Sequence, residues 1–192
     1  MPDKAVYVES VKRAIDVADK YNVFLINSAY MNLLTPCDRF CSSVAGAKIL
    51  YGPDGTMSLC YKVQSAATAN RDFVVGSYNV ITDKFEVDYE TIQKMKALSV
   101  DAFAECEFCF ARLICAGGCP NRNFSTTGDF SKPDPWMCSV KKELIRDAIF
   151  RIYSNSRENK RSVLLGSSYF ESMVNEKHKG DGHGRKERIA VC

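Results

Sequence analysis

The sequence lacks long apolar runs and has few histidines. No stretch approaches the roughly 18–20 apolar residues of a membrane-spanning helix. Met1-Pro2-Asp3-Lys4 is polar where a signal peptide needs an apolar segment. Two histidines among 192 residues leave little material for a Ser/His/Asp or Cys/His centre. We therefore expect a cytoplasmic protein that has no membrane partner and no such centre.

The sequence also lacks a strong excess of charge of one sign. Its 26 basic and 23 acidic side chains give a net charge of +3, and several of the basic ones gather near the C-terminus. A nucleic-acid-binding face needs a stripe of Lys and Arg along one surface. The pattern here has no such stripe, and we expect no nucleic-acid partner.

Cysteine, in contrast, is abundant, with nine residues in the chain. Nine is too many for an average cytosolic protein, and they are too sparse for a small disulfide scaffold. A reducing compartment argues against disulfides as their purpose. Thiolates that bind metal are therefore the leading explanation.

Apolar periodicity predicts a mixed fold, α+β, with short elements. The expected helices cover residues 6–21, a segment capped by Asp88, and the chain from Val140 to about residue 154. The expected strands cover residues 23–26, 47–51, 56–60, 73–76 and 85–87, with the second and third paired as a hairpin around Gly52-Pro53-Asp54-Gly55.

The pattern along the chain suggests three parts. Residues 1–36 contain a helix and a strand, residues 37–157 hold eight of the cysteines, and residues 158–192 form a polar tail that we expect to be mobile. Within the second part, Glu105 to Trp136 should be rich in loops. In the last helix we expect Ile149 to face inward and Lys141 to face outward.

Four of the cysteines form a compact motif. Cys106, Cys109, Cys115 and Cys119 have the spacing Cys-x2-Cys-x5-Cys-x3-Cys, with Gly117-Gly118 ahead of the last one. Four thiolates this close in sequence can converge on metal when the chain wraps tightly, which glycine permits. A zinc ribbon or treble-clef site uses similar Cys-x2-Cys pairs, so zinc remains an alternative.

The full cysteine series resembles the signature of the SPASM domain. Cys41, Gly55 and Cys60 have the spacing Cys-x13-Gly-x4-Cys, the motif above follows, and Cys138 comes last. SPASM domains carry auxiliary iron–sulfur clusters at the C-terminal end of radical S-adenosylmethionine enzymes that mature peptides and proteins. The resemblance covers residues 41–138, and it implies two 4Fe–4S clusters with eight ligands, of which Cys37 would be the eighth.

The resemblance also implies how the ligands divide. The first cluster would take Cys37, Cys41, Cys60 and Cys119, and the second would take Cys106, Cys109, Cys115 and Cys138. Cys138 falls near the start of the last helix, where the backbone N–H groups favour a thiolate. Four cations near the ligands in sequence, Arg39, Lys62, Arg112 and Arg122, are candidates for offsetting the cluster charge.

The catalytic half of the family is missing from this chain. Radical S-adenosylmethionine enzymes use a Cys-x3-Cys-x2-Cys site, but after Cys37 and Cys41 the third position is Val44, which cannot bind iron. Sulfatase-maturing relatives place an aspartate after the hairpin cysteine, whereas here Tyr61 follows Cys60, and we expect Tyr61 to be a packing residue. Residues 5–36 resemble the last helix and strand of the catalytic barrel.

We therefore expect an iron–sulfur module that is part of, or partner to, a radical S-adenosylmethionine enzyme. The implied partners are a peptide or protein substrate, a catalytic domain or chain, and an electron donor such as flavodoxin or ferredoxin. S-adenosylmethionine itself would bind only to that other domain, and whether this chain has any activity alone is open. Two alternatives remain: a zinc-stabilised interaction domain without redox activity, and a fragment whose partner has been lost.

Overall fold

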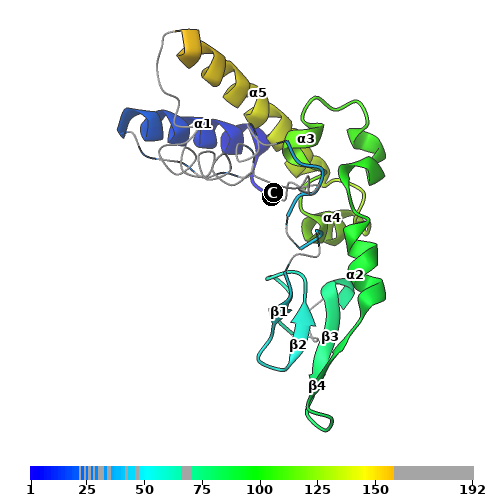
Figure 1. Cartoon of the computed structure of the whole chain (residues 1–192). Coiled ribbons are helices and arrows are strands. Elements are labelled where there is room, and N and C mark those ends of the chain that lie inside the picture. Colours follow the sequence, from blue (N-terminus) through cyan, green and yellow to red (C-terminus); the bar gives the residue numbers. More distant parts are fainter. Residues whose placement is uncertain are drawn as a thin grey trace, which may run out of the picture. The chain divides into compact units, whose positions relative to one another are not determined.

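The computed structural model describes residues 1–21, 36–41, 43–45, 48–65 and 71–157, together with Val23, Leu25, Asn27, Ala29 and Leu33. The described chain divides into two compact units (Figure 1). The helical unit contains residues up to Pro36 and residues 135–157, and the cysteine unit contains Cys37–Asp134. The tail expected over residues 158–192 lies outside the described residues, as do Phe24 and Ile26 of the expected strand.

The helical unit is a pair of helices, α1 (Lys4–Tyr21) and α5 (Pro135–Arg157), which pack against each other. Ile15 of α1 and Ile145 of α5 are fully buried. At one end of α1, the ammonium group of Lys4 lies 2.5 Å from the Glu143 carboxylate. The helix from Lys4 confirms the sequence expectation, and α5 is longer than expected at both ends.

Two expected orientations on α5 are wrong. Ile149 is 45% exposed, whereas Lys141 is only 3% exposed. The expected inward stripe ran through Ile149 on periodicity alone, but the buried face of α5 is narrower and centres on Val140, Leu144 and Ala148. The ammonium nitrogen of Lys141 is itself buried, which depends on its surroundings in the fold and which a polarity pattern does not anticipate.

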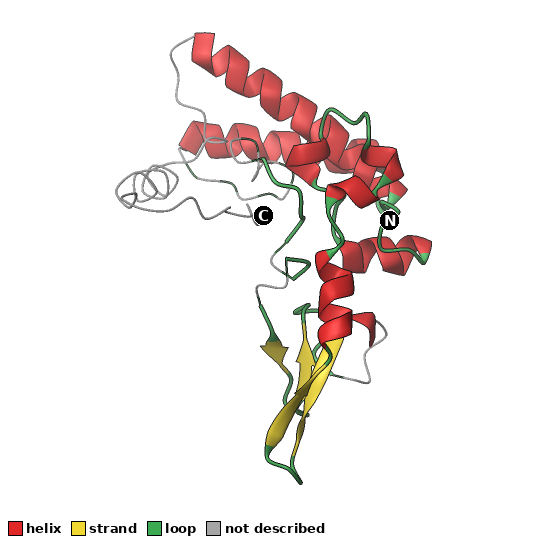
Figure 2. Cartoon of the chain, turned by 45° about the vertical axis from the view of Figure 1, so that its right-hand side comes forward, coloured by secondary structure: helices red, strands yellow, loops and turns green. Residues whose placement is uncertain are grey.

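The cysteine unit contains a four-stranded antiparallel sheet in the order β1-β2-β3-β4. The strands are β1 (Leu50–Tyr51), β2 (Thr56–Ser58), β3 (Val74–Asn79) and β4 (Lys84–Val87). The expected hairpin is confirmed as β1 and β2, with Gly55 at φ 80°, a left-handed conformation that suits glycine. Figure 2 shows the strong twist of the sheet. The fold class is thus α+β, as expected.

The helix α2 (Tyr89–Lys96) covers the sheet and completes the main core of this unit. Its N-cap is Asp88, whose carboxylate accepts a hydrogen bond from the Thr91 N–H at 3.0 Å, as the sequence predicted. Ile92 and Met95 are buried against Met57 and other apolar residues of the sheet. The remaining buried residues of this core are Leu59, Cys60, Val63, Phe73 and Val75.

The segment from Glu105 to Trp136 contains more helix than we expected. It holds a 3-10 helix (Ala104–Cys106), the single turn α3 (Arg112–Cys115) and α4 (Pro120–Thr127), and α5 begins at its end. These short turns have no sustained apolar period, so sequence patterning does not reveal them. Proline at the first position of α4 is a helix-start signal that marks this element.

A buried asparagine on α4 connects these turns. The Asn123 side-chain amide donates to the carbonyls of Gly117 (3.0 Å) and Phe130 (3.3 Å), and its oxygen accepts from the Asp134 N–H at 3.1 Å. Asn123 is 2% exposed, so these bonds are shielded from water. The turn before Cys119 is thereby fixed to the loop that follows α4.

None of the helices in the described part of the chain is both long enough and apolar enough to span a bilayer.

Candidate metal centre

The first predicted ligand segment is anchored to the rest of the cysteine unit. The backbone N–H of Cys37 donates to the Leu113 carbonyl at 2.8 Å, and the Asp38 carbonyl accepts from Val100 at 2.7 Å. The Arg39 side chain donates to the Lys96 carbonyl at 3.3 Å. Three elements thus hold the segment that presents Cys41.

Cys60 lies two residues after β2, where the predicted hairpin placed it. The chain turns there because the Val63 N–H donates to the Cys60 carbonyl at 2.8 Å. The Ser58 hydroxyl lies 2.6 Å from the Val63 carbonyl and 3.2 Å from that of Cys60. Cys60 is 6% exposed. The neighbouring Tyr61 is 70% exposed, so our expectation of a half-buried packing residue is wrong, because the tight turn directs it outward.

Cys119 is held at the start of α4 by a sharply wound turn. Ala116, Gly117 and Gly118 all have left-handed φ angles, of 49°, 75° and 81°. The Cys119 carbonyl then accepts the Asn123 N–H at 2.9 Å. Gly117 and Gly118 therefore allow the tight turn that the sequence predicted before Cys119.

Cys60 is influenced electrostatically by Cys41 and Cys119, and we call these three residues the thiol trio. Burial raises the pKa of the Cys60 thiol, and the charges of Cys119 and Cys41 raise it further. A hydrogen bond from the Lys62 backbone and the Lys62 ammonium group act in the opposite direction. Because such influence fades with distance, Cys41 and Cys119 each lie near Cys60, although the three come from separate segments. These are three of the four ligands predicted for the first cluster.

Cys37, the fourth residue of that set, is disulfide-bonded in the structure. A disulfide sulfur carries no thiolate, so Cys37 would act as a ligand only after reduction. The free thiols among the described residues are Cys41, Cys60, Cys106, Cys109, Cys115, Cys119 and Cys138.

The second predicted set lies mostly on consecutive turns. The N–H of Cys109 donates to the carbonyl of Cys106 at 3.2 Å, and the N–H of Cys115 donates to Ala111 at 2.8 Å. Cys106 is 7% exposed and packs with Val100 and Phe103. Cys138, by contrast, is on the first turn of α5 in the helical unit, so its place near a helix start agrees with expectation.

Arg112 is the cation beside the cysteines with the least satisfied side chain. Its guanidinium pairs with Asp101 and lies 3.4 Å from the Glu107 carbonyl. Its Nε is buried and has no hydrogen-bond partner within the described chain. The backbone of Arg112 is bonded to the Cys109 carbonyl at 3.0 Å, so this donor is fixed beside the second set. By comparison, Arg122 is paired with the buried Asp134.

The free thiols of the described residues are the right kind of ligand for an iron–sulfur cluster, but their side chains do not converge on one point. Across the part of the chain that the structure describes, no three His, Cys, Asp or Glu side chains form a metal-holding group. The donors are nonetheless free thiols beside a buried N–H donor, the environment that a cluster of charge about −2 requires. A cluster spreads its thiolates over four irons, so its ligands stand farther apart than those around one ion.

Comparison with known proteins adds no family. No family model matches the chain, and searches of curated proteins and of solved structures find no significant match. The likeness to the SPASM domain therefore rests on the cysteine spacing.

Proposed function

We propose that this chain is an iron–sulfur module that binds two 4Fe–4S clusters. The observation that supports the proposal is that Cys60 lies within electrostatic reach of Cys41 and of Cys119, two cysteines that the spacing motif assigns to the same cluster.

The first cluster would be held by Cys41, Cys60, Cys119 and reduced Cys37. The second would be held by Cys106, Cys109 and Cys115, with Cys138 as the ligand that the resemblance supplies. Bound clusters would accept and release single electrons. The cysteine thiolates of the chain would bind the irons, its apolar residues would shield the clusters from water, and Arg112 would supply positive charge.

In this role the module would serve radical S-adenosylmethionine chemistry carried by other sequence. It would transfer electrons away from a modified peptide, or dock that peptide near the reacting centre. No residue of this chain is assigned a catalytic step, because the Cys-x3-Cys-x2-Cys site is interrupted at Val44.

A zinc-stabilised interaction domain is the competing function. The consecutive turns that carry Cys106, Cys109 and Cys115 favour it, because zinc sites are commonly built from such short loops. In this version the thiol trio would hold a second ion or none.

The two functions differ in colour and redox response. After anaerobic reconstitution, an iron–sulfur module absorbs visible light and bleaches on reduction by dithionite, whereas zinc–thiolate sites are colourless and redox-silent. We expect reversible bleaching. A colourless protein that retains stoichiometric zinc would contradict the proposal and support the interaction domain.

A further inference from the structure

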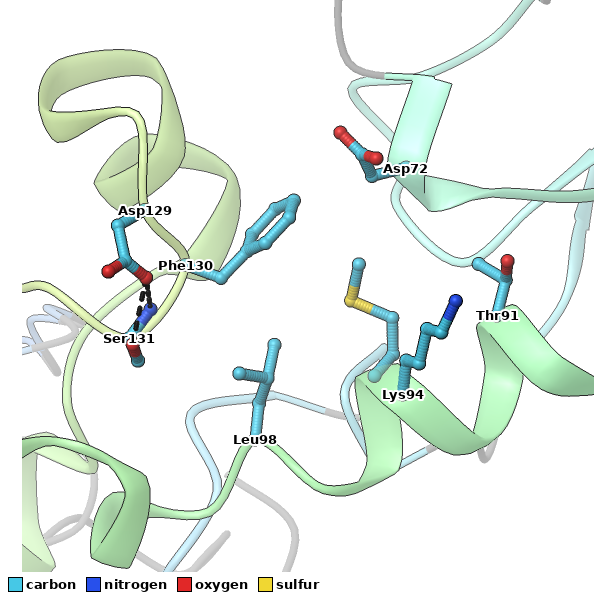
Figure 3. A pocket seen from close by; sticks show the side chains of 8 residues that line it. Asp72, Thr91, Lys94, Leu98, Asp129, Phe130 and Ser131 are labelled. Carbon is cyan, nitrogen blue, oxygen red and sulfur yellow. Dashed lines mark hydrogen bonds between the residues drawn. The ribbon is translucent and has the colours of Figure 1, made fainter.

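A pocket of about 340 Å³ lies in the cysteine unit, and no cysteine lines it (Figure 3). Its walls come from α2, the loop after α4, and the 3-10 helix Arg71–Phe73. Figure 3 shows Phe130 and Leu98 pointing into the space between these elements, with Asp72 on the opposite wall. The volume is at the lower end of the range for ligand sites.

The floor of the pocket is apolar and rigid. The Phe130 ring is stacked on Phe124 at a centroid distance of 4.4 Å and meets the edge of Phe73 at 5.5 Å. Met95, also in the wall, is 4% exposed and belongs to the main core. A ligand group that enters therefore meets a preformed aromatic and aliphatic surface.

The rim of the pocket is negatively charged. Asp72 is exposed and has no hydrogen bond or ion pair with any residue that the structure describes. Asp129 accepts two bonds of 2.8 Å from Ser131, both at Oδ1. The one cation in the wall, Lys94, is neutralised by Glu90 at 2.8 Å. Two carboxylates and one ammonium group give the lining residues a formal charge of −1, and Lys132 acts on Asp129 from outside the lining.

We propose that this pocket binds the side chain of an arginine or lysine residue of a peptide or protein. An apolar floor beneath a carboxylate rim matches a side chain with an aliphatic stem and a cationic head.

Charge complementarity decides against other occupants. An apolar side chain would cover Asp72 and leave its carboxylate without water or a partner, which is unfavourable. An acidic or phosphorylated group would be repelled by both carboxylates. The proposal is independent of the metal assignment, because the lining residues include no cysteine.

The test uses the full-length protein and a blocked tripeptide, acetyl-Gly-Arg-Gly-amide. Its matched control replaces arginine with citrulline, which has nearly the same shape and no charge. Titration would be followed by calorimetry and by the Met95 methyl resonance of protein labelled at its six methionines. We expect the arginine peptide to bind and to shift Met95, and the citrulline peptide to bind at least several-fold more weakly.

The Asp72→Asn variant removes the unpaired carboxylate from an exposed position and should leave the fold intact. We expect it to weaken arginine-peptide binding about two- to fivefold at low salt, the range for an exposed charge pair. Asp83→Asn is the control, since it removes the same charge from the β3–β4 turn and asparagine tolerates the left-handed φ of 53° there.

Three results would overturn the proposal. They are the absence of binding by the arginine peptide at millimolar concentration, equal affinity for the citrulline peptide, and an equal loss of affinity in Asp83→Asn. Agmatine, a free guanidinium amine, tests the source of the cation. If agmatine bound as tightly as the tripeptide, the site would be one for a small amine and the peptide assignment would be wrong.

Discussion

Cys60 is the residue on which the proposed first cluster most depends. It is buried, it ends a tight turn after β2, and its thiol is influenced by both other members of the thiol trio. Burial without metal keeps this thiol protonated, so cluster assembly must release its proton. The surroundings of Cys60 therefore disfavour a free thiolate, whereas a metal ion would stabilise the thiolate by binding it.

Replacing this residue should remove one cluster and leave the other. In Cys60→Ser we expect about four iron and four sulfide fewer per chain than in the parent protein. Tyr61→Phe is the control, since Tyr61 follows Cys60 directly, is exposed and is assigned no ligand role, and it should keep the parent content. Equal iron content in Cys60→Ser and the parent would contradict the ligand assignment.

Asp88 gives a prediction about pH. The hydrogen bonds from Thr91 lower the pKa of this N-cap carboxylate. Because the folded-state pKa lies below the unfolded value, the carboxylate stabilises the fold fully above the ordinary aspartate pKa. That stability is lost as pH falls through the lowered value.

The measurement compares the free energy of unfolding of the parent and Asp88→Asn between pH 2 and pH 7. Asparagine retains the cap but cannot titrate, so the parent should be the more stable at neutral pH, with the difference shrinking in acid. A difference that stays constant across this pH range would show that the charge of Asp88 is not what stabilises α2.

At the scale of the element, the turn between Cys115 and Cys119 needs glycine for two reasons. Gly117 has φ 75°, and a Cβ there would lie 2.7 Å from the Phe103 ring. Gly128 has nearly the same φ, 77°, yet a Cβ there would meet nothing within 4 Å. A substitution at Gly128 therefore introduces backbone strain alone, whereas one at Gly117 introduces backbone strain and steric overlap.

We expect Gly128→Ala to lose about 1 kcal/mol of stability, the strain of a left-handed alanine. Gly117→Ala should lose this and a further ~1–3 kcal/mol for overpacking, and should bind less iron because the turn to Cys119 is displaced. Chemical denaturation and iron analysis test both variants. If Gly117→Ala and Gly128→Ala lost the same stability, the Phe103 ring would have moved aside with no energetic penalty.

The elements with a local signal are those that the sequence predicted. The hairpin of β1 and β2 follows from Gly52-Pro53-Asp54-Gly55, and α2 follows from Asp88 and the apolar spacing of Ile92 and Met95. The turns of residues 104–127 were missed because packing around Asn123 and Phe103, and not periodicity, determines them. Burial of Lys141 likewise depends on its surroundings in the fold.

The part of the candidate site that the sequence could predict is the set of cysteines, because their spacing follows a motif. Cysteine spacing assigns Cys41, Cys60 and Cys119 to one cluster, and in the structure Cys41 and Cys119 each act electrostatically on Cys60. The assignment of these residues as ligands stays a prediction. The pocket of Asp72, Asp129 and Phe130 has no sequence signal, since its three walls are separated along the chain. The buried Nε of Arg112 is also a property of tertiary packing, although its position beside cysteines made it one of four candidates.

At the scale of the whole molecule, the two ends of the cysteine unit differ in what orders them. The sheet and α2 share an extensive apolar core, whereas the cluster around Cys106 contains only Val100 and Phe103 besides that cysteine. Metal should therefore contribute more to the folding of the cysteine-rich turns than to the sheet.

Metal removal tests this difference. After chelation under reducing conditions, we expect protease cleavage within residues 104–119 while residues 50–96 stay protected, as mapped by mass spectrometry. Loss of protection over both segments at once would mean that the unit unfolds cooperatively. Unchanged protection of residues 104–119 would mean that metal does not order these turns.

The most direct test of the central claim is the content of iron, zinc and acid-labile sulfide per chain after anaerobic reconstitution. Two 4Fe–4S clusters predict about eight iron and eight sulfide with little zinc. Stoichiometric zinc without sulfide would contradict the account and make this chain a structural interaction domain.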